Sequence, residues 1–325
     1  MKYYETIVVG AGPCGLAAAI ELEQNNIEYL VIEEGNIVNA IYNYPTHQTF
    51  FSSSEKLAIG KFPFITEAHK PKRNQALVYY REVVKHYSLN INTYERVTSS
   101  RKTEEGFTVE TSKGQYMCTY LIIATGYYGQ PNKLDVPGAG KDKVFHYFKE
   151  AHPFFNQHVL IIGGKNSSVD AAIELEKAGS HVTIVYRGDD YSKSIKPWIL
   201  PQLKSLIKHG KVAHYFNAEM IDIKDDTVIF STDEGTVEIK NDFVFAMIGY
   251  HPDYRFLKSL GIELEEYKNG LSPVHDSATM ETNVEDLYIA GVIAAGNDAN
   301  MIVIENGRFH GGRIIKDILK KKSHK

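Results

Sequence analysis

The chain has 325 residues, of which 43% are hydrophobic and 23% charged, an ordinary globular composition whose length predicts about two domains of ~100–200 residues each. Lys and Arg number 36 and Asp and Glu 40, so the net charge is −4, without the basic excess that marks nucleic-acid-binding domains. The two cysteines, Cys14 and Cys118, form no CxxC pair, which excludes a disulfide framework, a cysteine-based zinc site and a thioredoxin-type dithiol.

The first predicted unit covers residues 7–35 and reads as an apolar strand, a glycine-rich turn, an amphipathic helix and a second apolar strand. The turn fits G-x-G-x-x-G, whose glycines permit a tight turn, close approach to a pyrophosphate, and close packing of helix on strand. Glu33 ends the second strand, where a carboxylate binds ribose hydroxyls and would repel a 2′-phosphate. We therefore predict a site for FAD or an NAD-like ligand. Its residues are Gly10, Gly12, Pro13, Cys14, Gly15 and Glu33.

The segment that follows predicts smaller elements of the same domain. Residues 79–87 read as a helix, and alternating residues between 93 and 115, with Gly106 and Gly114, predict a small antiparallel β-meander. A buried strand at 120–124 then leads into Thr125 and Gly126. The proline-containing stretch 131–138 reads as a crossover to another domain.

The second predicted unit, residues 160–188, repeats the first at an offset of 153, and AAIELE at 18–23 recurs at 171–176. Lys165 replaces the middle glycine; it supplies a point charge to phosphate, or alternatively points to solvent. Tyr186 and Arg187 align with Glu33 and Glu34 of the first unit. An arginine binds a 2′-phosphate through paired hydrogen bonds, so this position favours NADPH over NADH. The predicted nucleotide-binding residues are Gly163, Gly164, Lys165, Asn166, Ser167, Tyr186, Arg187 and Lys193.

A nested domain organisation follows from the positions of the two units. A strand at 243–247 leads to a second crossover at 248–252, and the chain then returns to the first domain, ending its sheet near Ala290 and Gly291. We predict an α/β protein with two Rossmann-like domains, one inserted in the other: 1–127 with 251–325 for FAD, and 128–250 for NADPH. Further cofactor contacts are expected from Thr125, Gly126, Gly249, Gly291, Asn300 and Met301.

The whole chain resembles the bacillithiol disulfide reductases, which are NADPH-dependent flavoenzymes of the thioredoxin-reductase group. The resemblance is carried by residues 12–15, 42–47, 146–152, 195–198 and 304–307, together with the two glycine-rich turns and the late Ala-Gly. It implies FAD and NADPH as cofactors, a small-molecule disulfide as substrate and a homodimer. It also implies that His47 lies in a segment that reaches the flavin.

Two departures from the larger flavoprotein class matter for the chemistry. Residues 146–155 hold no cysteine where thioredoxin reductases carry CxxC, and Val292 follows the late Ala-Gly where an aspartate usually binds the flavin chain. Asn297, Asp298 and Asn300 are the candidates to replace that aspartate. A helix beginning near Met301 is expected to stabilise the negative charge of reduced flavin with its N-terminal N–H groups.

Cys14 is the candidate catalytic thiol. It begins the first helix, and a helix N-terminus lowers a thiol pKa, although a pyrophosphate bound at the same terminus carries more negative charge than the dipole offsets. One interpretation is that Cys14 attacks the substrate disulfide to form a mixed disulfide; the other is that it is a small side chain under the cofactor. Cys118 reads as a buried small hydrophobe.

The preferred function is reduction of a low-molecular-weight thiol disulfide by NADPH through FAD. The alternative is a thioredoxin-reductase-like ferredoxin/flavodoxin–NADP reductase, and a third hypothesis is a redox or nucleotide sensor. A flavin monooxygenase is disfavoured, because the F-x-G-x-x-x-H motif fails at Tyr147 and Ala151. No metal, nucleic-acid or membrane partner is expected. We expect a cytoplasmic enzyme for three reasons. The cysteine count is low, no apolar run approaches the ~20 residues of a membrane span, and the sequence shows no signal peptide.

Overall fold

The computed structural model describes residues 1–267, 270–298 and 301–323. The chain forms two compact units, Met1–Gln130 with Tyr250–Lys325 and Pro131–Gly249, whereas the sequence placed the breaks at 127/128 and 250/251. Within the described ranges, no helix is long and apolar enough to cross a membrane.

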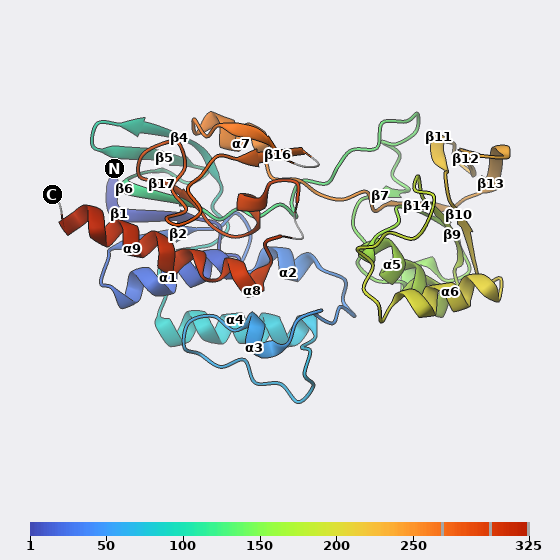
Figure 1. Cartoon of the computed structure of the whole chain (residues 1–325), viewed down its shortest axis with the longest axis horizontal. Helices are drawn as coiled ribbons and strands as arrows, with labels where there is room; N and C mark the ends of the chain where they lie inside the picture. The colour runs from blue at the N-terminus through green and yellow to red at the C-terminus, as the bar shows by residue number, and fades with distance from the viewer. Residues whose placement is uncertain (268–269, 299–300, 324–325) are drawn as a thin grey trace. The chain divides into compact units, whose positions relative to one another are not determined.

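The first unit is built on a parallel sheet in the order β3-β2-β1-β6, with β17 also paired to β6 (Figure 1). The predicted meander is confirmed, because β4, β5 and the first half of β6 pair antiparallel. β6 therefore serves both the parallel core and the meander. The strands are β1 (Lys2–Val9), β2 (Tyr29–Ile32), β3 (Ile91–Asn92), β4 (Val97–Thr103), β5 (Gly106–Thr111), β6 (Gln115–Ile123) and β17 (Leu287–Ile289).

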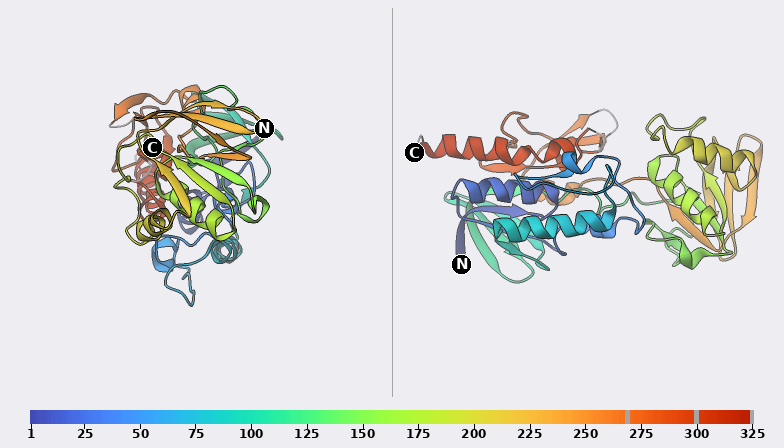
Figure 2. Two further views of the ribbon diagram at one scale, coloured as in Figure 1. Left: turned by 90° about the vertical axis from the view of Figure 1, so that its right-hand side faces the viewer. Right: turned by 90° about the horizontal axis from the view of Figure 1, so that it is seen from below.

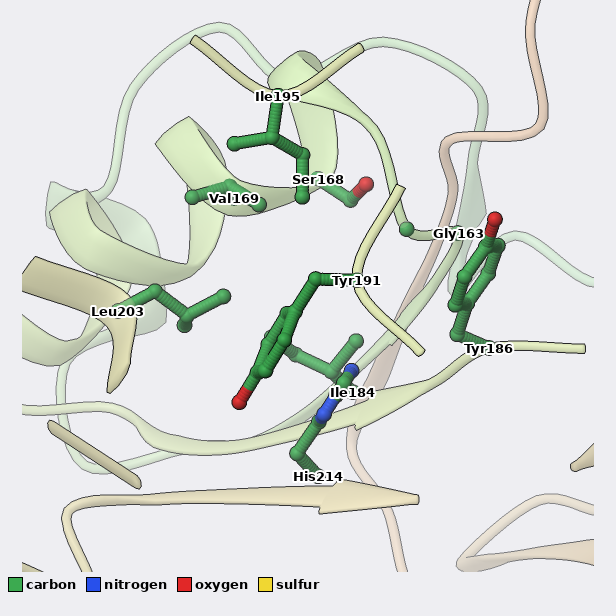
Figure 3. Close-up of a pocket in the computed structure, with 10 residues that line it drawn as sticks. Gly163, Ser168, Val169, Ile184, Tyr186, Tyr191, Ile195, Leu203 and His214 are labelled. Atoms are coloured by element: carbon green, nitrogen blue, oxygen red, sulfur yellow. The ribbon is translucent and has the colours of Figure 1, made fainter. Parts of the chain in front are cut away.

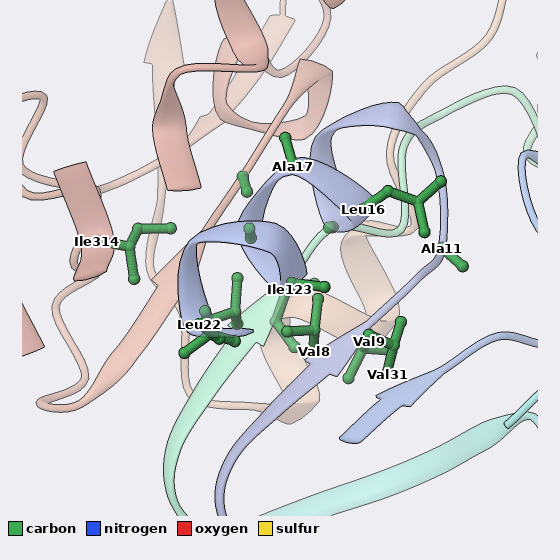
Figure 4. Packing of buried hydrophobic residues seen from close by; sticks show 14 of the residues in the cluster. Val8, Val9, Ala11, Leu16, Ala17, Leu22, Val31, Ile123 and Ile314 are labelled. Atoms are coloured by element: carbon green, nitrogen blue, oxygen red, sulfur yellow. The ribbon is translucent and has the colours of Figure 1, made fainter. Parts of the chain in front are cut away.

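Helix α1 (Pro13–Gln24) is buried between this sheet and helix α9 (His310–Ser323). Figure 4 shows Leu22 of α1 close to Val8 and Ile123 of the strands, with Ile314 of α9 on another side of α1. A Cβ on Gly311 would lie 2.7 Å from the Cα of Ala18, so α9 approaches α1 closely only because that residue is glycine. The apolar helix predicted after the first turn is thus enclosed on two sides.

The remaining elements of the first unit lie at its edges (Figures 1 and 2). The helix predicted at 79–87 is α4 and begins earlier, at Arg73, because the side chain of Gln75 accepts a hydrogen bond from the Lys72 N–H and caps it (2.8 Å). The others are α2 (Asn39–Asn43), α3 (Ser54–Leu57), α7 (Tyr254–Ser259), β15 (Leu264–Tyr267), β16 (Gly270–Pro273), a 3₁₀ turn at Val292–Ala295, and α8 (Ile304–Gly307).

The second unit has a parallel sheet in the order β10-β9-β8-β14-β7. Because side chains alternate across a strand, Val159 and Ile161 pack against the helices α5 and α6, whereas Leu160 and Ile162 pack against a three-stranded antiparallel sheet. That second sheet was not predicted. The elements are β7 (Val144–Phe145), a 3₁₀ turn (His152–Phe154), β8 (His158–Ile162), α5 (Asn166–Lys177), β9 (His181–Val185), α6 (Leu200–Lys208), β10 (Val212–Tyr215), β11 (Glu219–Ile223), β12 (Thr227–Thr232), β13 (Gly235–Lys240) and β14 (Phe243–Ala246).

Candidate functional site

The three glycines of the first turn are required for different structural reasons. Gly10 has φ +105°, and a Cβ there would lie 2.6 Å from the carbonyl oxygen of Ala124; a Cβ on Gly15 would lie 2.0 Å from the carbonyl oxygen of Gly10. Around Gly12, by contrast, no atom of the described residues lies within 4 Å of such a Cβ. The fold requires Gly10 and Gly15, and Gly12 leaves bare backbone beside the first helical residue, Pro13. This arrangement fits a pyrophosphate at the helix N-terminus.

Glu33 is tied to the same turn. Its carboxylate oxygens accept hydrogen bonds from the N–H groups of Ala11 and Gly35, each at 2.8 Å. The side chain is only 8% exposed, and this burial raises its pKa. Because each carboxylate oxygen has a second lone pair, Glu33 can hold the turn and still accept a ribose hydroxyl.

The late Ala-Gly and the motif at the end of β6 meet the first turn. A Cβ on Gly10 would also lie 3.2 Å from the Cα of Thr125, and the next residue, Gly126, has φ +70°. Gly291 has φ +82°, and its N–H donates to Nδ1 of the buried His310 at 3.2 Å. Motifs far apart in the chain therefore gather at the carboxyl ends of β1, β6 and β17, where open α/β sheets bind ligands.

Cys14 lies in a narrow slot between the end of β17 and helix α8. A Cβ on Gly291 would lie 3.1 Å from the Cys14 Sγ, and a Cβ on Gly307 would lie 2.9 Å from it. Gly307 belongs to a motif noted in the sequence, but nothing there indicated that it encloses the thiol. Burial raises the pKa of Cys14 to about 12, so this structure has a neutral thiol at the start of α1.

Alkylation of Cys14 should therefore be slow in the native protein and should rise steeply with pH. Only the thiolate reacts, and a thiol with a pKa near 12 gains roughly tenfold in thiolate per pH unit between pH 7 and 9. Iodoacetamide labelling followed by peptide mass spectrometry measures the rate, with urea-unfolded protein as the reference. A rate that levels off near pH 7 would show a stabilised thiolate instead.

Helix α8, which forms one wall of the slot, is anchored to α3. The Arg308 guanidinium donates to the carbonyl oxygens of Glu55, at 2.9 Å, and Ala58. The Glu305 carboxylate accepts from the Ser52 hydroxyl and pairs with Lys56 at 3.5 Å, and these contacts hold its pKa below its ordinary value. The slot is therefore held by residues that the sequence analysis did not identify.

The predicted flavin contacts beyond the turn have mixed outcomes. The helix expected from about Met301 begins instead at Ile304, because the Asn306 side chain caps the Val303 N–H at 2.8 Å. Met301 lies in a turn and is 52% exposed. The Asn297 amide oxygen accepts a hydrogen bond from the Tyr254 hydroxyl. Asn300 lies outside the described residues, and Asp298 and His47 remain predictions; His47 lies half-buried in a turn after α2.

The glycine-rich turn of the second unit repeats the geometry of the first. The Gly163 N–H donates to the carbonyl oxygen of Val185 at 3.0 Å, and the Gly10 N–H donates to the carbonyl oxygen of Ile32 at 2.8 Å. Donor and acceptor of the second turn each lie 153 residues after their counterparts in the first turn. Ser168 occupies the third glycine's position, a departure that the sequence analysis did not weigh. Its hydroxyl accepts from the Lys165 N–H at 3.0 Å and donates to the Lys165 carbonyl at 2.9 Å.

The predicted nucleotide-binding side chains separate into two groups. The Tyr186 ring covers the turn: a Cβ on Gly164 would lie 2.4 Å from it and one on Gly188 2.5 Å, and Figure 3 shows the ring beside Gly163. The other group is solvent-exposed and consists of Lys165, Ser167, Arg187 and Lys193. Gly249, at the second crossover, has φ +94°. Its carbonyl oxygen accepts a hydrogen bond from the backbone N–H of Asn132 at 2.9 Å.

Asn166 holds the loop that carries the exposed cations. Its side-chain N–H donates to the Ser194 carbonyl at 2.9 Å, and its oxygen accepts from the Lys196 N–H at 2.8 Å. In the same loop Tyr191 stacks on His214, with ring centroids 5.4 Å apart and planes at 10° (Figure 3). Asn166 therefore positions the loop after β9 relative to the glycine-rich turn.

Comparison with known proteins identifies the family. The family model described as pyridine nucleotide-disulphide oxidoreductase matches residues 7–291. The chain belongs to this family. Membership makes the protein an oxidoreductase that uses a flavin and a pyridine nucleotide.

Individual relatives are much more similar and span the whole chain. The "Bacilliredoxin reductase Bdr" of Bacillus subtilis (strain 168) is 57% identical over 98% of this chain and 99% of the relative. The solved structure of "Bacillithiol Disulfide Reductase Bdr (YpdA)" from Staphylococcus aureus is 60% identical, covers 99% of this chain and 100% of that one, and superposes with a TM-score of 0.97. The resemblance stated from the motifs is thus confirmed.

The fold class is also confirmed. The thioredoxin reductase of T. acidophilum is 22% identical and covers 99% of both chains, with a TM-score of 0.77. At that identity the likeness concerns the fold alone. It supports the predicted fold of two Rossmann-like domains.

Proposed function

We propose that this family member is an FAD-containing reductase that uses NADPH to reduce bacillithiol disulfide. In the balanced reaction, the disulfide, NADPH and one proton give two thiols and NADP⁺. The observation that carries the proposal is the position of Cys14, a thiol in a slot directly beside the bare backbone of Gly12. Two solved relatives, from Staphylococcus aureus and Bacillus cereus, are named bacillithiol disulfide reductases, which supports this substrate.

The first unit, Met1–Gln130 with Tyr250–Lys325, is proposed to bind FAD. Gly10, Gly12 and Gly15 shape the pyrophosphate site, and Glu33 binds the ribose. A bound FAD supplies the acceptor for a hydride and the donor of two electrons to a disulfide. The chain's own part is to hold the turn through Glu33, to seat Cys14 between Gly291 and Gly307, and to fix Gly291 through His310.

The second unit, Pro131–Gly249, is proposed to bind NADPH. Its turn has the same hydrogen-bond frame as the first, and exposed Arg187 and Lys193 stand on the loop that Asn166 holds. No acidic residue occupies the position of Glu33, so nothing there repels a 2′-phosphate.

Arg187→Ala should lower the preference for NADPH over NADH. A charge-assisted contact is worth ~1.5–3 kcal/mol, which corresponds to roughly 10- to 150-fold in the ratio of kcat/KM for the two nucleotides. The measurement is the rate of flavin reduction by each nucleotide. Lys193→Ala is the matched control on the same loop, and an unchanged preference in Arg187→Ala together with a lost one in Lys193→Ala would transfer the role to Lys193.

A second candidate substrate is a protein disulfide. The Bacillus subtilis relative carries the name bacilliredoxin reductase, which describes a protein acceptor. The two candidates separate in one experiment, in which NADPH oxidation is followed with bacillithiol disulfide alone, with an oxidised bacilliredoxin alone, and with ferredoxin as the third acceptor. Turnover with the small disulfide alone supports the first proposal; turnover only with bacilliredoxin supports the second.

Cytoplasmic location and a homodimer are proposed as well. The chain carries two free cysteines and no disulfide, which suits a reducing compartment. Light scattering of the purified protein measures the oligomeric state directly.

A further inference from the structure

A buried histidine at the start of α9 holds the backbone at the end of β17. His310 is 5% exposed, and its Nδ1 accepts the hydrogen bond that the Gly291 N–H donates. An accepting Nδ1 carries no proton, so the ring is neutral with its proton on Nε2. Burial, with smaller contributions from Arg313 and His275, lowers the pKa of His310 to about 4, which keeps the accepting form at neutral pH.

The backbone held in this way has an unusual conformation. Gly291 has φ +82° and ψ −156°, a combination that is essentially restricted to glycine. On either side of its N–H the chain is held by backbone groups: the Ala290 N–H donates to Ile123 at 2.8 Å, and the Gly291 carbonyl oxygen accepts from the Ala294 N–H at 3.1 Å. The Gly291 N–H is held by a side chain instead, so a single substitution can release it.

This stretch of backbone lies directly against the Cys14 side chain. A Cβ on Gly291 would lie 3.0 Å from the Cys14 Cβ and 3.1 Å from its Sγ. A Cβ on Gly307, in the opposite wall of the slot, would lie 3.2 Å from the Gly291 Cα. With neighbours this close, a small displacement of Gly291 changes the space around the thiol.

The histidine itself is fixed relative to the helix that carries Cys14. The next residue, Gly311, packs on α1 so closely that a Cβ there would lie 2.7 Å from the Cα of Ala18, which is one helical turn beyond Cys14. The contact of α9 with α1, the His310 ring and the Gly291 peptide therefore form a closed path that begins and ends beside the thiol.

We propose that His310 is a positioning residue for Cys14: by holding the Gly291 N–H, it keeps the slot closed around the thiol. His310 acts through Gly291, and its acceptor atom, rather than its bulk, is the functional part. The importance of this positioning for disulfide reduction rests on the proposed role of Cys14, but the state of the slot can be measured without any disulfide substrate.

Removal of the acceptor should open the slot. A buried N–H without an acceptor loses its hydrogen bond and gains none from water. Conformations in which the Gly291 peptide turns outward to solvent would therefore become more populated. These conformations expose the Cys14 thiol to water and to reagents.

The test compares His310→Leu with His310→Asn in the FAD-loaded enzyme. The two side chains have nearly the same shape, but the asparagine Oδ1 takes the place of Nδ1 as acceptor, whereas leucine has none. We expect iodoacetamide to label Cys14 faster in His310→Leu than in His310→Asn by roughly 5- to 150-fold, which corresponds to about 1–3 kcal/mol. The labelling rate of His310→Asn should stay close to that of the wild-type protein.

Cys118 provides an internal control in each sample. It is buried in β6 of the same unit, so its labelling rate reports general loosening of the fold and should not change. His310→Phe, which keeps the volume of the ring without an acceptor, should behave as His310→Leu does and takes its place if the smaller side chain prevents folding.

Two outcomes would overturn the proposal. One is a Cys14 labelling rate in His310→Leu that is no higher than in His310→Asn. The other is a parallel rise for Cys14 and Cys118, which would show that the hydrogen bond stabilises the unit as a whole. Failure of the proposed function is a different result, because it would appear as full disulfide turnover by Cys14→Ala and would leave these labelling rates unaffected.

Discussion

Cys14→Ala should retain FAD, accept electrons from NADPH at a near-normal rate, and lose turnover with bacillithiol disulfide by ~10³-fold or more. The retained half-reaction follows from the slot: alanine is smaller than cysteine, so it fits between Gly291 and Gly307 without a clash. The lost half-reaction follows from removing the thiol that would form the mixed disulfide. Stopped-flow flavin reduction and steady-state NADPH oxidation measure the two halves separately.

Cys118→Ala is the matched control for this experiment. Cys118 is 1% exposed, as the sequence analysis predicted for a buried small hydrophobe, so its replacement should affect stability and leave disulfide turnover intact. The wild-type enzyme, incubated with the disulfide at pH 9, should also gain one mixed-disulfide adduct on Cys14, and the adduct should form more slowly at pH 7, where less of the buried thiol is ionised. Full disulfide turnover by Cys14→Ala would show that the reduced flavin meets the substrate directly and that Cys14 only packs.

Gly12→Val should give a folded protein without flavin. The backbone at Gly12 has φ −70° and ψ 173°, which a valine adopts without strain, and a Cβ there meets no described atom within 4 Å. The side chain would instead occupy the approach to the pyrophosphate. Circular dichroism should show native secondary structure. Visible absorbance should show a flavin content below about a tenth of that of the wild-type protein, which corresponds to a loss of at least ~1.4 kcal/mol in binding free energy.

Gly15→Val separates a binding role from a folding role in the same turn. Its Cβ would lie 2.0 Å from the Gly10 carbonyl oxygen, a backbone contact that cannot yield, so this variant should fail to fold. Stoichiometric flavin in Gly12→Val would contradict the assignment of the first turn to FAD. A folded Gly15→Val would contradict the packing described for α1.

The repeat was readable from the sequence because its signals are local. A glycine turn, an apolar strand and a helix start all act within about 35 residues, so Gly10, Glu33 and Gly163 could be located by spacing alone. The antiparallel meander followed from the alternation of residues between 93 and 115, whereas the parallel sheets followed from the two strand–turn–helix–strand units. The three-stranded sheet β11–β13 was missed, and the start of α8 was placed three residues too early because the Asn306 cap was not considered.

By itself, then, the sequence determined the α/β class, the two glycine-rich turns and a cysteine at the first of them. Only the tertiary structure decided what surrounds that cysteine: Gly307 lies against Cys14 although 293 residues separate them (307 − 14), and His310 fixes Gly291. It also decided that Asn166 holds the loop after β9. The physical reason is that spacing along the chain limits which neighbours a residue has within one turn or strand, whereas contacts between distant segments depend on how closely the packed backbones approach.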